Sequence, residues 1–151
     1  MTHAHYLRLA TEAAAAAARS GGGPFGAVLK ETNGDRVFVD HNHVTEGNDP
    51  TAHAEVSVIR QACRELGTFA LTGYTLYASC EPCPMCLGAA LWARVDAVYF
   101  NANREDAAQA GFDDSAFYEL LDQGEVATEL RLENAAAPFD AWRENSGRTE
   151  Y

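Results

Sequence analysis

The sequence predicts an α/β domain built from layers of helices and strands. Segments rich in helix-forming residues alternate with short apolar segments, a pattern typical of layered α/β domains. The length of 151 residues matches one domain of ordinary size, and the hydrophobic fraction of 47% is typical of a globular protein with its own core. No internal repeat or linker interrupts the sequence. We therefore expect residues 1–151 to form one domain.

The first segments predict a helix followed by a hairpin. His3–Arg19 contains six consecutive alanines, and the run Gly21–Pro24 ends the helix. Phe25–Lys30 is short and apolar, as expected of a buried strand. Asn33-Gly34 is a hairpin signal, so Arg36–Asp40 is expected to be the returning strand.

A second helix is predicted from Ala52 to Leu66, after a polar loop. Asp49 or Thr51 is expected to cap it, and Gly67 to end it. Apolar runs and helix signals predict the remaining elements in the same way. The expected strands are Tyr74–Ala78, Val95–Phe100 and Val126–Leu132, and the expected helices are Pro84–Ala93, Asp106–Ala110, Ser115–Leu121 and Pro138–Glu144.

The charge balance bears on the choice of partner. Eleven Lys and Arg residues oppose twenty-two Asp and Glu residues, which gives a net charge of −11. Such a surface repels polyphosphate backbones, so we expect a small-molecule substrate and no nucleic-acid partner. No segment approaches the length of an apolar membrane span, and the N-terminus lacks the pattern of a secretory signal. We expect a cytoplasmic protein without membrane contact.

Two short motifs carry the chemistry. The first is His53-Ala54-Glu55, and the second is Pro82-Cys83-Pro84-Met85-Cys86. They match H-x-E followed by P-C-x-x-C, the signature of zinc-dependent nucleobase deamination. One imidazole and two thiolates hold Zn²⁺ and leave a fourth position open, which distinguishes a catalytic zinc site from a structural one. We predict His53, Cys83 and Cys86 as ligands and Glu55 as the catalytic acid and base.

Two points in this prediction depend on the fold. Cys80 and Cys83 also form a C-x-x-C pair, although Cys83 and Cys86 have the preceding proline and a following helix that lowers the thiol pKa. Residues two apart inside a helix point about 200° away from each other. His53 and Glu55 therefore share a site only if they lie at the tip of their helix.

Several longer stretches resemble the cytidine deaminase-like family of zinc nucleobase and nucleoside deaminases, and within it the guanine deaminases. The similarity extends over nearly the whole chain. The zinc motifs are common to the family, whereas the Gly-Phe-Asp-Asp segment and the tail are specific to the guanine enzymes. The matching stretches are Gly23–Val28, Asn48–Val56, Ser79–Ala89, Trp92–Arg94, Ala110–Ser115, Pro138–Arg143 and Glu150-Tyr151.

The resemblance implies a three-layer α/β/α fold with a five-stranded mixed sheet and one zinc ion per chain. It also implies a homodimer whose subunits exchange a C-terminal segment, about residues 130–151, and the hydrolysis of guanine to xanthine and ammonia. Site roles carry over residue by residue. Asn42 and the Ala54 backbone would hold the purine, Phe25 would pack on its ring, Asp114 would orient it, and Tyr151 of a partner would close the site.

Several alternatives remain open at the level of sequence. The same machinery serves guanosine, cytosine and aminotriazine deaminases, which differ in pocket shape. A tRNA adenosine deaminase shares the zinc motifs but normally has a basic face. A structural zinc module without activity would leave Glu55 idle. Asp113 and Asp114 also fit a helix cap before Ser115, so their separate roles stay open, as do the exchange of the tail and its order without ligand.

Overall fold

The computed structural model describes residues 1–124 and 126–151. The chain forms two compact units, Met1–Asp114 and Ser115–Tyr151, each described here by itself. The first unit contains the sheet and the helices that precede Asp114, and the second contains the helices that follow it. Among the described residues, no helix combines the length and the apolar character that crossing a membrane requires.

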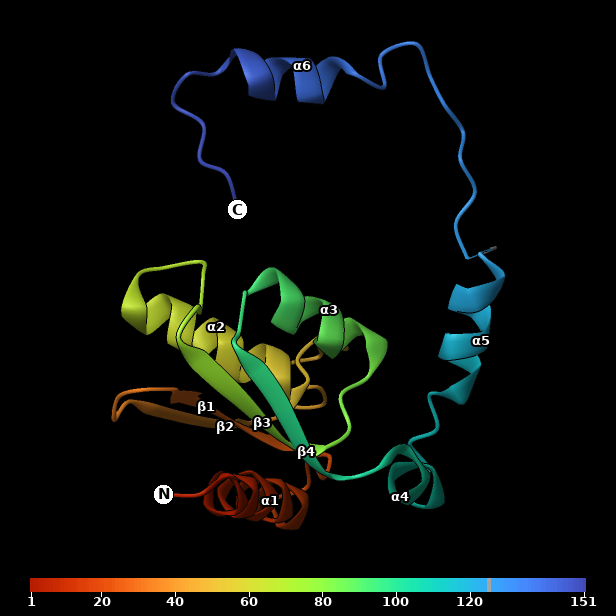
Figure 1. The fold of residues 1–151 in the computed structure, drawn as a ribbon. Helices are drawn as coiled ribbons and strands as arrows, with labels where there is room; N and C mark the ends of the chain where they lie inside the picture. Colours follow the sequence, from red (N-terminus) through yellow and green to blue (C-terminus); the bar gives the residue numbers. More distant parts are fainter. Residues whose placement is uncertain (125) are drawn as a thin grey trace. The chain divides into compact units, whose positions relative to one another are not determined.

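A mixed sheet forms the centre of the first unit. It contains β1 (Gly26–Glu31), β2 (Val37–His41), β3 (Tyr74–Cys80) and β4 (Ala97–Ala102), in the order β2-β1-β3-β4 (Figure 1). β1 pairs antiparallel with both β2 and β3, whereas β3 and β4 are parallel. The predicted α/β fold and mixed sheet are confirmed.

The prediction of a fifth strand at Val126–Leu132 is wrong. Within the described residues the sheet has four strands, and Val126–Leu132 is not a strand. This segment alternates apolar and polar residues as a strand does, yet the side chains of Val126, Leu130 and Leu132 are 62%, 86% and 60% exposed. A strand needs a neighbour that accepts and donates its backbone hydrogen bonds, and the alternating pattern alone does not supply one.

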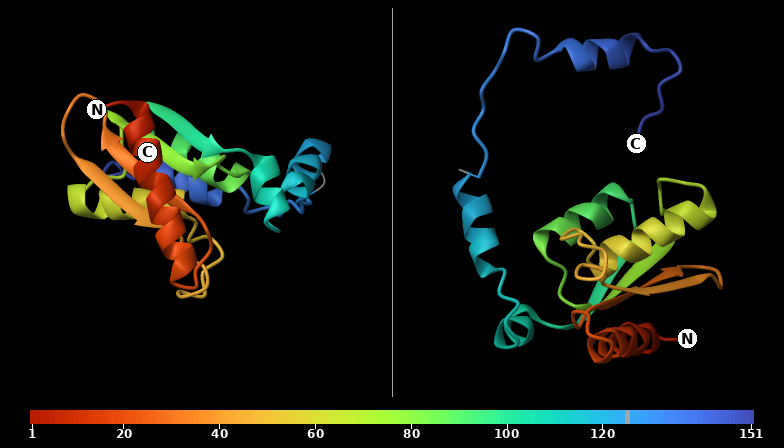
Figure 2. Two further views of the ribbon diagram at one scale, coloured as in Figure 1. Left: turned by 90° about the horizontal axis from the view of Figure 1, so that it is seen from below. Right: turned by 180° about the vertical axis from the view of Figure 1, so that it is seen from behind.

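Helices cover both faces of the sheet. α1 (His3–Arg19) packs on one face against β1 and β3, and α2 (Ala54–Leu66) packs on the other, next to α3 (Pro84–Trp92) (Figures 1 and 2). α1 approaches β1 so closely that a Cβ atom on Gly26 would lie 2.3 Å from the Ala10 carbonyl oxygen. Glycine is therefore required at this crossing.

Two hydrophobic clusters make up the core, one on each face of the sheet. Val28 and Tyr77 pack with α1, whereas Leu29 and Leu76 point to the opposite face and pack with Val58 of α2. Alternate side chains of a strand point to opposite faces, which explains how β1 and β3 serve both clusters. The sheet is consequently buried on both sides and holds the ends of its strands and helices in fixed positions.

The remaining helices are short. α4 (Arg104–Gln109) begins with a capping box, in which Asn103 and Asp106 exchange side chain–backbone hydrogen bonds. α5 (Ser115–Gln123) and α6 (Ala137–Glu144) belong to the second unit, and neither has a buried residue. The six helices of the described residues, α1 to α6, each overlap one of the six expected helices.

Candidate metal centre

The loop before α2 determines where His53 lies. Asp49 and Thr51 do not cap the helix, contrary to expectation. The Asp49 carboxylate instead accepts hydrogen bonds from the Thr51 backbone N–H at 2.9 Å and from the Thr51 hydroxyl at 2.7 Å. This local turn ends two residues before the helix, and His53 becomes the N-cap.

The helix tip brings His53 and Glu55 to the same end of α2. His53 has extended backbone angles, φ −61° and ψ 157°, so its side chain does not follow the helical spiral. Glu55 is the second helical residue, and its charge acts on the imidazole of His53. His53 and Glu55 therefore lie at the tip of their helix, as they must if they are to share a site despite being two residues apart.

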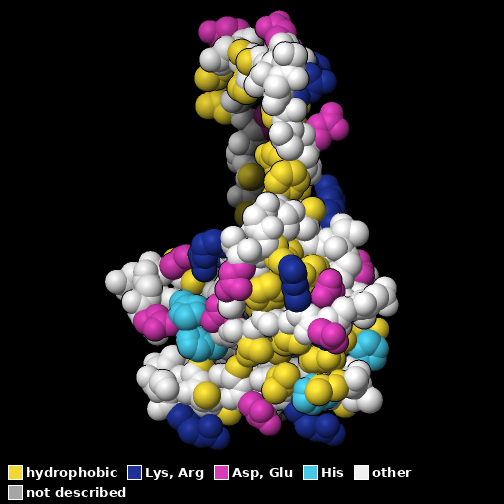
Figure 3. All heavy atoms as spheres, turned by 90° about the vertical axis from the view of Figure 1, so that its left-hand side faces the viewer, with side chains coloured by type: hydrophobic (Ala, Val, Ile, Leu, Met, Phe, Trp, Pro, Cys, Tyr) yellow, Lys and Arg dark blue, Asp and Glu magenta, His cyan; other side chains and the backbone are white. Residues whose placement is uncertain are grey.

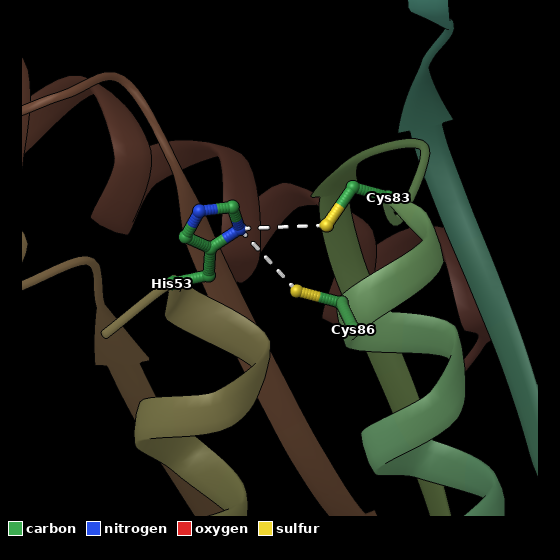
Figure 4. A group of neighbouring side chains, drawn as sticks. All are labelled: His53, Cys83 and Cys86. Atoms are coloured by element: carbon green, nitrogen blue, oxygen red, sulfur yellow. Dashed lines mark hydrogen bonds between the residues drawn. The ribbon is translucent and has the colours of Figure 1, made fainter. Parts of the chain in front are cut away.

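The two cysteines come from the tip of the neighbouring helix. Cys83 is the N-cap of α3, Pro84 is its first residue, and Cys86 lies in its first turn. The His53 Nδ1 atom lies 3.6 Å from the Cys83 sulfur and 3.4 Å from the Cys86 sulfur (Figure 4). Both thiols thus lie at the positive end of a helix dipole, which favours thiolates.

The spacing of the three donor atoms fits zinc. With bond lengths of about 2.05 Å to nitrogen and 2.3 Å to sulfur, a tetrahedral zinc ion separates a nitrogen and a sulfur ligand by about 3.6 Å. The observed separations of 3.4 and 3.6 Å agree with that value, and all three ligand atoms lie within 4.8 Å of one another. The donor set of one imidazole and two thiols is also one that zinc favours.

Cys80 lies outside this group. It ends β3, and its sulfur contacts the Asn103 carbonyl oxygen at 3.7 Å. The ligand atoms that lie within 4.8 Å of one another at this site are those of His53, Cys83 and Cys86, and Cys80 is not among them. The pair Cys83 and Cys86 is therefore the one that faces His53, as the preceding proline and following helix indicated.

The thiolate forms first at Cys83. Its pKa is lowered to about 4, mainly because the Cys86 thiol donates a hydrogen bond to it, with a further contribution from His53. The same hydrogen bond raises the pKa of Cys86, and burial raises it further. His53 has a raised pKa because of its contact with Cys83. A bound cation favours the thiolate at both cysteines and the neutral imidazole.

Glu55 is a buried carboxyl group beside these donors. Only 7% of the residue is exposed, and burial raises its pKa because the charged carboxylate loses its solvent. Cys86 and the charge of His53 oppose this shift. A raised pKa makes a carboxyl group easier to protonate, which suits a group that both accepts and releases a proton in general acid–base chemistry.

Asn42 and Ala54 lie in the same unit as the three donors. Asn42 is buried, and its side-chain amide donates to the backbone carbonyl oxygens of Gly23 and Phe25. It therefore ties β2 to the segment that enters β1. Ala54 is fully buried at the first position of α2, where backbone N–H groups have no acceptor within the helix.

Phe25 has a partner that the sequence interpretation did not single out. Its ring packs edge-to-face against Phe112, with centroids 5.0 Å apart and an interplanar angle of 86°. Phe112 belongs to the Gly-Phe-Asp-Asp segment, in which only the aspartates have a role predicted from the sequence. The phenylalanine of this motif is the sequence signal that could have indicated the contact. The contact joins the segment before Asp114 to the segment before β1.

Two further predicted residues lie farther along the chain. Asp114 is half-buried and is the last residue of the first unit, directly before α5. Tyr151 belongs to the second unit and is 76% exposed. Neither is part of the His53, Cys83 and Cys86 group, so their roles stay predictions.

An ion pair that the sequence did not indicate braces the cysteine loop. Arg104, at the start of α4, lies 2.9 Å from the carboxylate of Glu81, two residues before Cys83. The Glu81 backbone N–H also donates to the Ala102 carbonyl oxygen at the end of β4. The loop carrying Cys83 is therefore attached to β4 and α4.

Comparisons with known proteins agree with this site. Residues 1–102 match the cytidine and deoxycytidylate deaminase zinc-binding region. The guanine deaminase of Bacillus subtilis is 46% identical over the full length of both chains, and a tRNA-specific adenosine deaminase of the same organism is 44% identical over 64% of this chain and 60% of its own.

Solved structures give the same result. The X-ray structure of guanine deaminase from Bacillus subtilis is similar with a TM-score of 0.93 and 44% identity, over 100% of this chain and 99% of that one. A guanine deaminase from Nitrosomonas europaea has a TM-score of 0.68 and 27% identity, over 90% of this chain and 70% of its own. The chain therefore belongs to the zinc-binding cytidine and deoxycytidylate deaminase family.

Proposed function

We propose that this protein is a zinc-dependent guanine deaminase, which hydrolyses guanine to xanthine and ammonia. The observation that carries the proposal is the close grouping of His53, Cys83 and Cys86. Glu55 lies at the same helix tip as His53. The full-length similarity to a guanine deaminase supports guanine as the substrate. Thiolate ligands need a reducing compartment, which supports a cytoplasmic location.

His53, Cys83 and Cys86 would hold one Zn²⁺ per chain. When bound, the ion supplies a Lewis acid that activates water for hydrolysis. The protein holds the donors at two helix tips braced by the sheet, so the site is formed before substrate arrives. Burial of Glu55 beside these donors excludes bulk water from the proton it moves.

Glu55 moves the protons of the reaction. Its carboxylate takes a proton from the attacking water and passes it to a ring nitrogen of guanine as the carbon–oxygen bond forms at C2. It then takes the remaining proton from the new C2 hydroxyl and passes it to the C2 amino group; the carbon–nitrogen bond breaks, the C2 carbonyl forms, and ammonia leaves. The raised pKa of Glu55 supports this double role, because a carboxyl group that is easily protonated also donates readily.

The purine would lie against the first unit. The Asn42 side chain and the Ala54 backbone would hold its polar edge, and Phe25 would pack on its ring. The contact between Phe25 and Phe112 supports this placement, because it brings the Gly-Phe-Asp-Asp segment to the residue expected to meet the purine. We add Phe112 to the apolar wall of the site.

Asp114 would select guanine over adenine. Guanine presents a hydrogen-bond donor at N1, where adenine presents an acceptor, so a carboxylate pairs with guanine and not with adenine. A mismatched buried polar pair costs about 1–3 kcal/mol. Replacement of Asp114 by alanine is therefore expected to reduce the preference for guanine.

A second copy would complete the site. We propose a homodimer in which about residues 130–151 are exchanged, so that Tyr151 of the partner closes over the purine. The exposed apolar side chains of the second unit support the exchange, because this unit contains no sheet against which it could bury them.

Deamination of adenosine in tRNA is the competing activity. It is supported by 44% identity to a tRNA-specific adenosine deaminase, but that similarity covers only 64% of the chain. A net charge of −11 also opposes binding to a polyanion. Guanine therefore remains the better-supported substrate.

A substrate panel tests the proposal. Zinc-loaded protein is incubated with guanine, guanosine, adenine, cytosine, ammeline or a tRNA anticodon stem, and ammonia release is measured. We expect guanine to have the highest kcat/KM. Faster release from another substrate would overturn the assignment of guanine, and zinc binding without release from any of them would favour a structural zinc module.

A further inference from the structure

A second cluster of metal-binding side chains lies at the end of β2. Asp40, His41 and His43 each offer one ligand atom, and these atoms lie within 4.8 Å of one another. The His43 Nε2 atom lies 2.7 Å from Asp40 Oδ1, and the His41 Nδ1 atom lies 4.0 Å from the same oxygen. The rings of the two histidines are 4.3 Å apart between centroids. Figure 3 shows histidine side chains next to acidic ones on one face of the molecule.

The second nitrogen of His43 is already oriented. Its Nδ1 atom bonds to the Glu46 carboxylate, which leaves Nε2 to face Asp40. A histidine that binds a metal through one ring nitrogen commonly donates the other N–H to a carboxylate, which fixes the tautomer and the ring. Glu46, His43 and the oxygen of Asp40 have this arrangement.

His41 supplies a second independent observation. Its Nδ1 atom is buried and has no hydrogen-bond partner among the described residues, although it is directed to within 4.0 Å of Asp40. Leaving a buried polar atom without a hydrogen-bond partner is unfavourable, because the atom loses its solvent and gains nothing in exchange. An ion pair between Asp40 and His43 alone leaves this cost in place, whereas a shared cation removes it.

A hollow opens on the His41 side of the cluster, and Asp40 and His43 do not line it. The hollow has a volume of about 240 Å³ and is lined by His41, Asn42, Thr45 and Glu46 together with the end of α1. The side chains of His41 and His43 are 36% and 38% exposed, so both can shift toward a common ligand.

We propose that Asp40, His41 and His43 form a second divalent transition-metal site, with Glu46 orienting His43. Two imidazoles and one carboxylate are donors that Zn²⁺ and Co²⁺ accept, whereas Mg²⁺ and Ca²⁺ prefer oxygen ligands. The cation takes the place of the proton between His43 and Asp40. This site shares no ligand with the cysteine site.

The position of the site connects it to the cysteine centre. The His43 backbone N–H donates to the Ala52 carbonyl oxygen at 2.9 Å, which closes the loop that His53 follows directly. Asn42 lies between the ligands His41 and His43 in the sequence. A cation at this point would stiffen both the loop before His53 and the segment carrying Asn42.

Counting bound metal tests the proposal. Protein with its cysteine site already loaded with zinc is titrated with Zn²⁺ by calorimetry, and the total is counted by equilibrium dialysis. We expect one further equivalent in the wild type, its loss in His41→Gln and in His43→Gln, and its retention in His5→Gln, a matched control on α1. The zinc retained at the cysteine site reports that each variant is folded.

Cobalt gives a readout that does not depend on counting. The further equivalent of Co²⁺ should add no thiolate-to-cobalt absorption, because the second site contains no sulfur. A thiolate band from that equivalent, no binding at all, or equal binding by His41→Gln and the wild type would overturn the proposal. Failure of guanine turnover would leave these results unchanged, so the two proposals fail separately.

Discussion

The two units of the chain differ in where their apolar side chains lie. The buried hydrophobic residues of the described chain all fall between Tyr6 and Ala93, in the first unit. In the second unit, Leu130, Phe139 and Tyr151 are 86%, 63% and 76% exposed. Burying a leucine or phenylalanine contributes about 1.5–3 kcal/mol, which the second unit forgoes.

The two units therefore differ in how much of their stability comes from their own packing. The first unit has a sheet covered on both faces and needs no further chain to form the metal centre. The second unit has helices without a buried residue, so its stability must come from contacts outside itself. The His53, Cys83 and Cys86 group and Glu55 all lie in the first unit, and the exchange of the second unit with a partner is the proposal that the predictions below test.

Replacement of Glu55 by glutamine is expected to have the largest effect, a loss of turnover without loss of the fold. Glu55→Gln should lower kcat by about 10²–10⁴-fold, because the amide cannot carry the proton. Zinc content should remain unchanged, since Glu55 is not a ligand in this account. Steady-state ammonia release and metal analysis of the same preparation check both parts. A Glu55→Gln enzyme with wild-type turnover would remove Glu55 from the mechanism.

The next effect compares two leucines directly. Leu76 is fully buried in the sheet, and Leu76→Ala should lower the free energy of unfolding by about 2–5 kcal/mol at any protein concentration. Leu130→Ala should cost less than about 0.5 kcal/mol in dilute protein and more where dimers form. Denaturation with urea at several protein concentrations checks this. Equal and concentration-independent losses would show that the two units do not differ as described.

A smaller effect sharpens the role of the second unit. Tyr151→Ala should weaken guanine binding by about 0.5–1.5 kcal/mol if one hydrogen bond is lost, and Tyr151→Phe should reproduce that loss if the hydroxyl is responsible. The measurement is KM for guanine, with Zn²⁺ content as the control. Unchanged KM in both variants would exclude Tyr151 from the site.

The smallest effect concerns a polar clamp on the first unit. Asp96 accepts hydrogen bonds from the Thr32 hydroxyl at 2.7 Å and from the Gly73 N–H at 2.8 Å, and these bonds lower its pKa. Because the folded pKa is below the unfolded one, this stabilisation is present above the unfolded pKa and is lost as the pH falls through the folded pKa. Asp96→Asn should therefore lower the Tm slightly at pH 7, with the gap closing below about pH 4. A gap that persists in acid would point to another cause.

Most of the first unit could be predicted from local signals. The alanine run and its glycine stop predicted α1, and Asn33-Gly34 predicted the hairpin of β1 and β2. The prediction of a strand at Val126–Leu132 was wrong, because an alternating pattern indicates which side chains share a face but not which strand would pair with the segment. The prediction that Asp49 or Thr51 caps α2 was wrong, because the Asp49 carboxylate accepts hydrogen bonds from Thr51 instead.

The candidate site could be predicted only in part. H-x-E and P-C-x-x-C gave the donor types, and the cap positions of His53 and Cys83 explain why those spacings bring the donors together. The contact of Phe25 with Phe112 and the ion pair of Glu81 with Arg104 join residues far apart in the sequence, so no local pattern indicated them. The pairing of His41 with Asp40 and His43 likewise needed the turn at the end of β2.

Removing and restoring zinc tests whether guanine hydrolysis depends on the metal bound by His53, Cys83 and Cys86. Zinc is removed with a chelator, ammonia release from guanine is measured, and one equivalent of Zn²⁺ is added back to the wild type and to Cys86→Ala. We predict that activity disappears with the metal, returns in the wild type, and does not return in Cys86→Ala. Full guanine turnover by metal-free protein would show that the reaction does not require zinc.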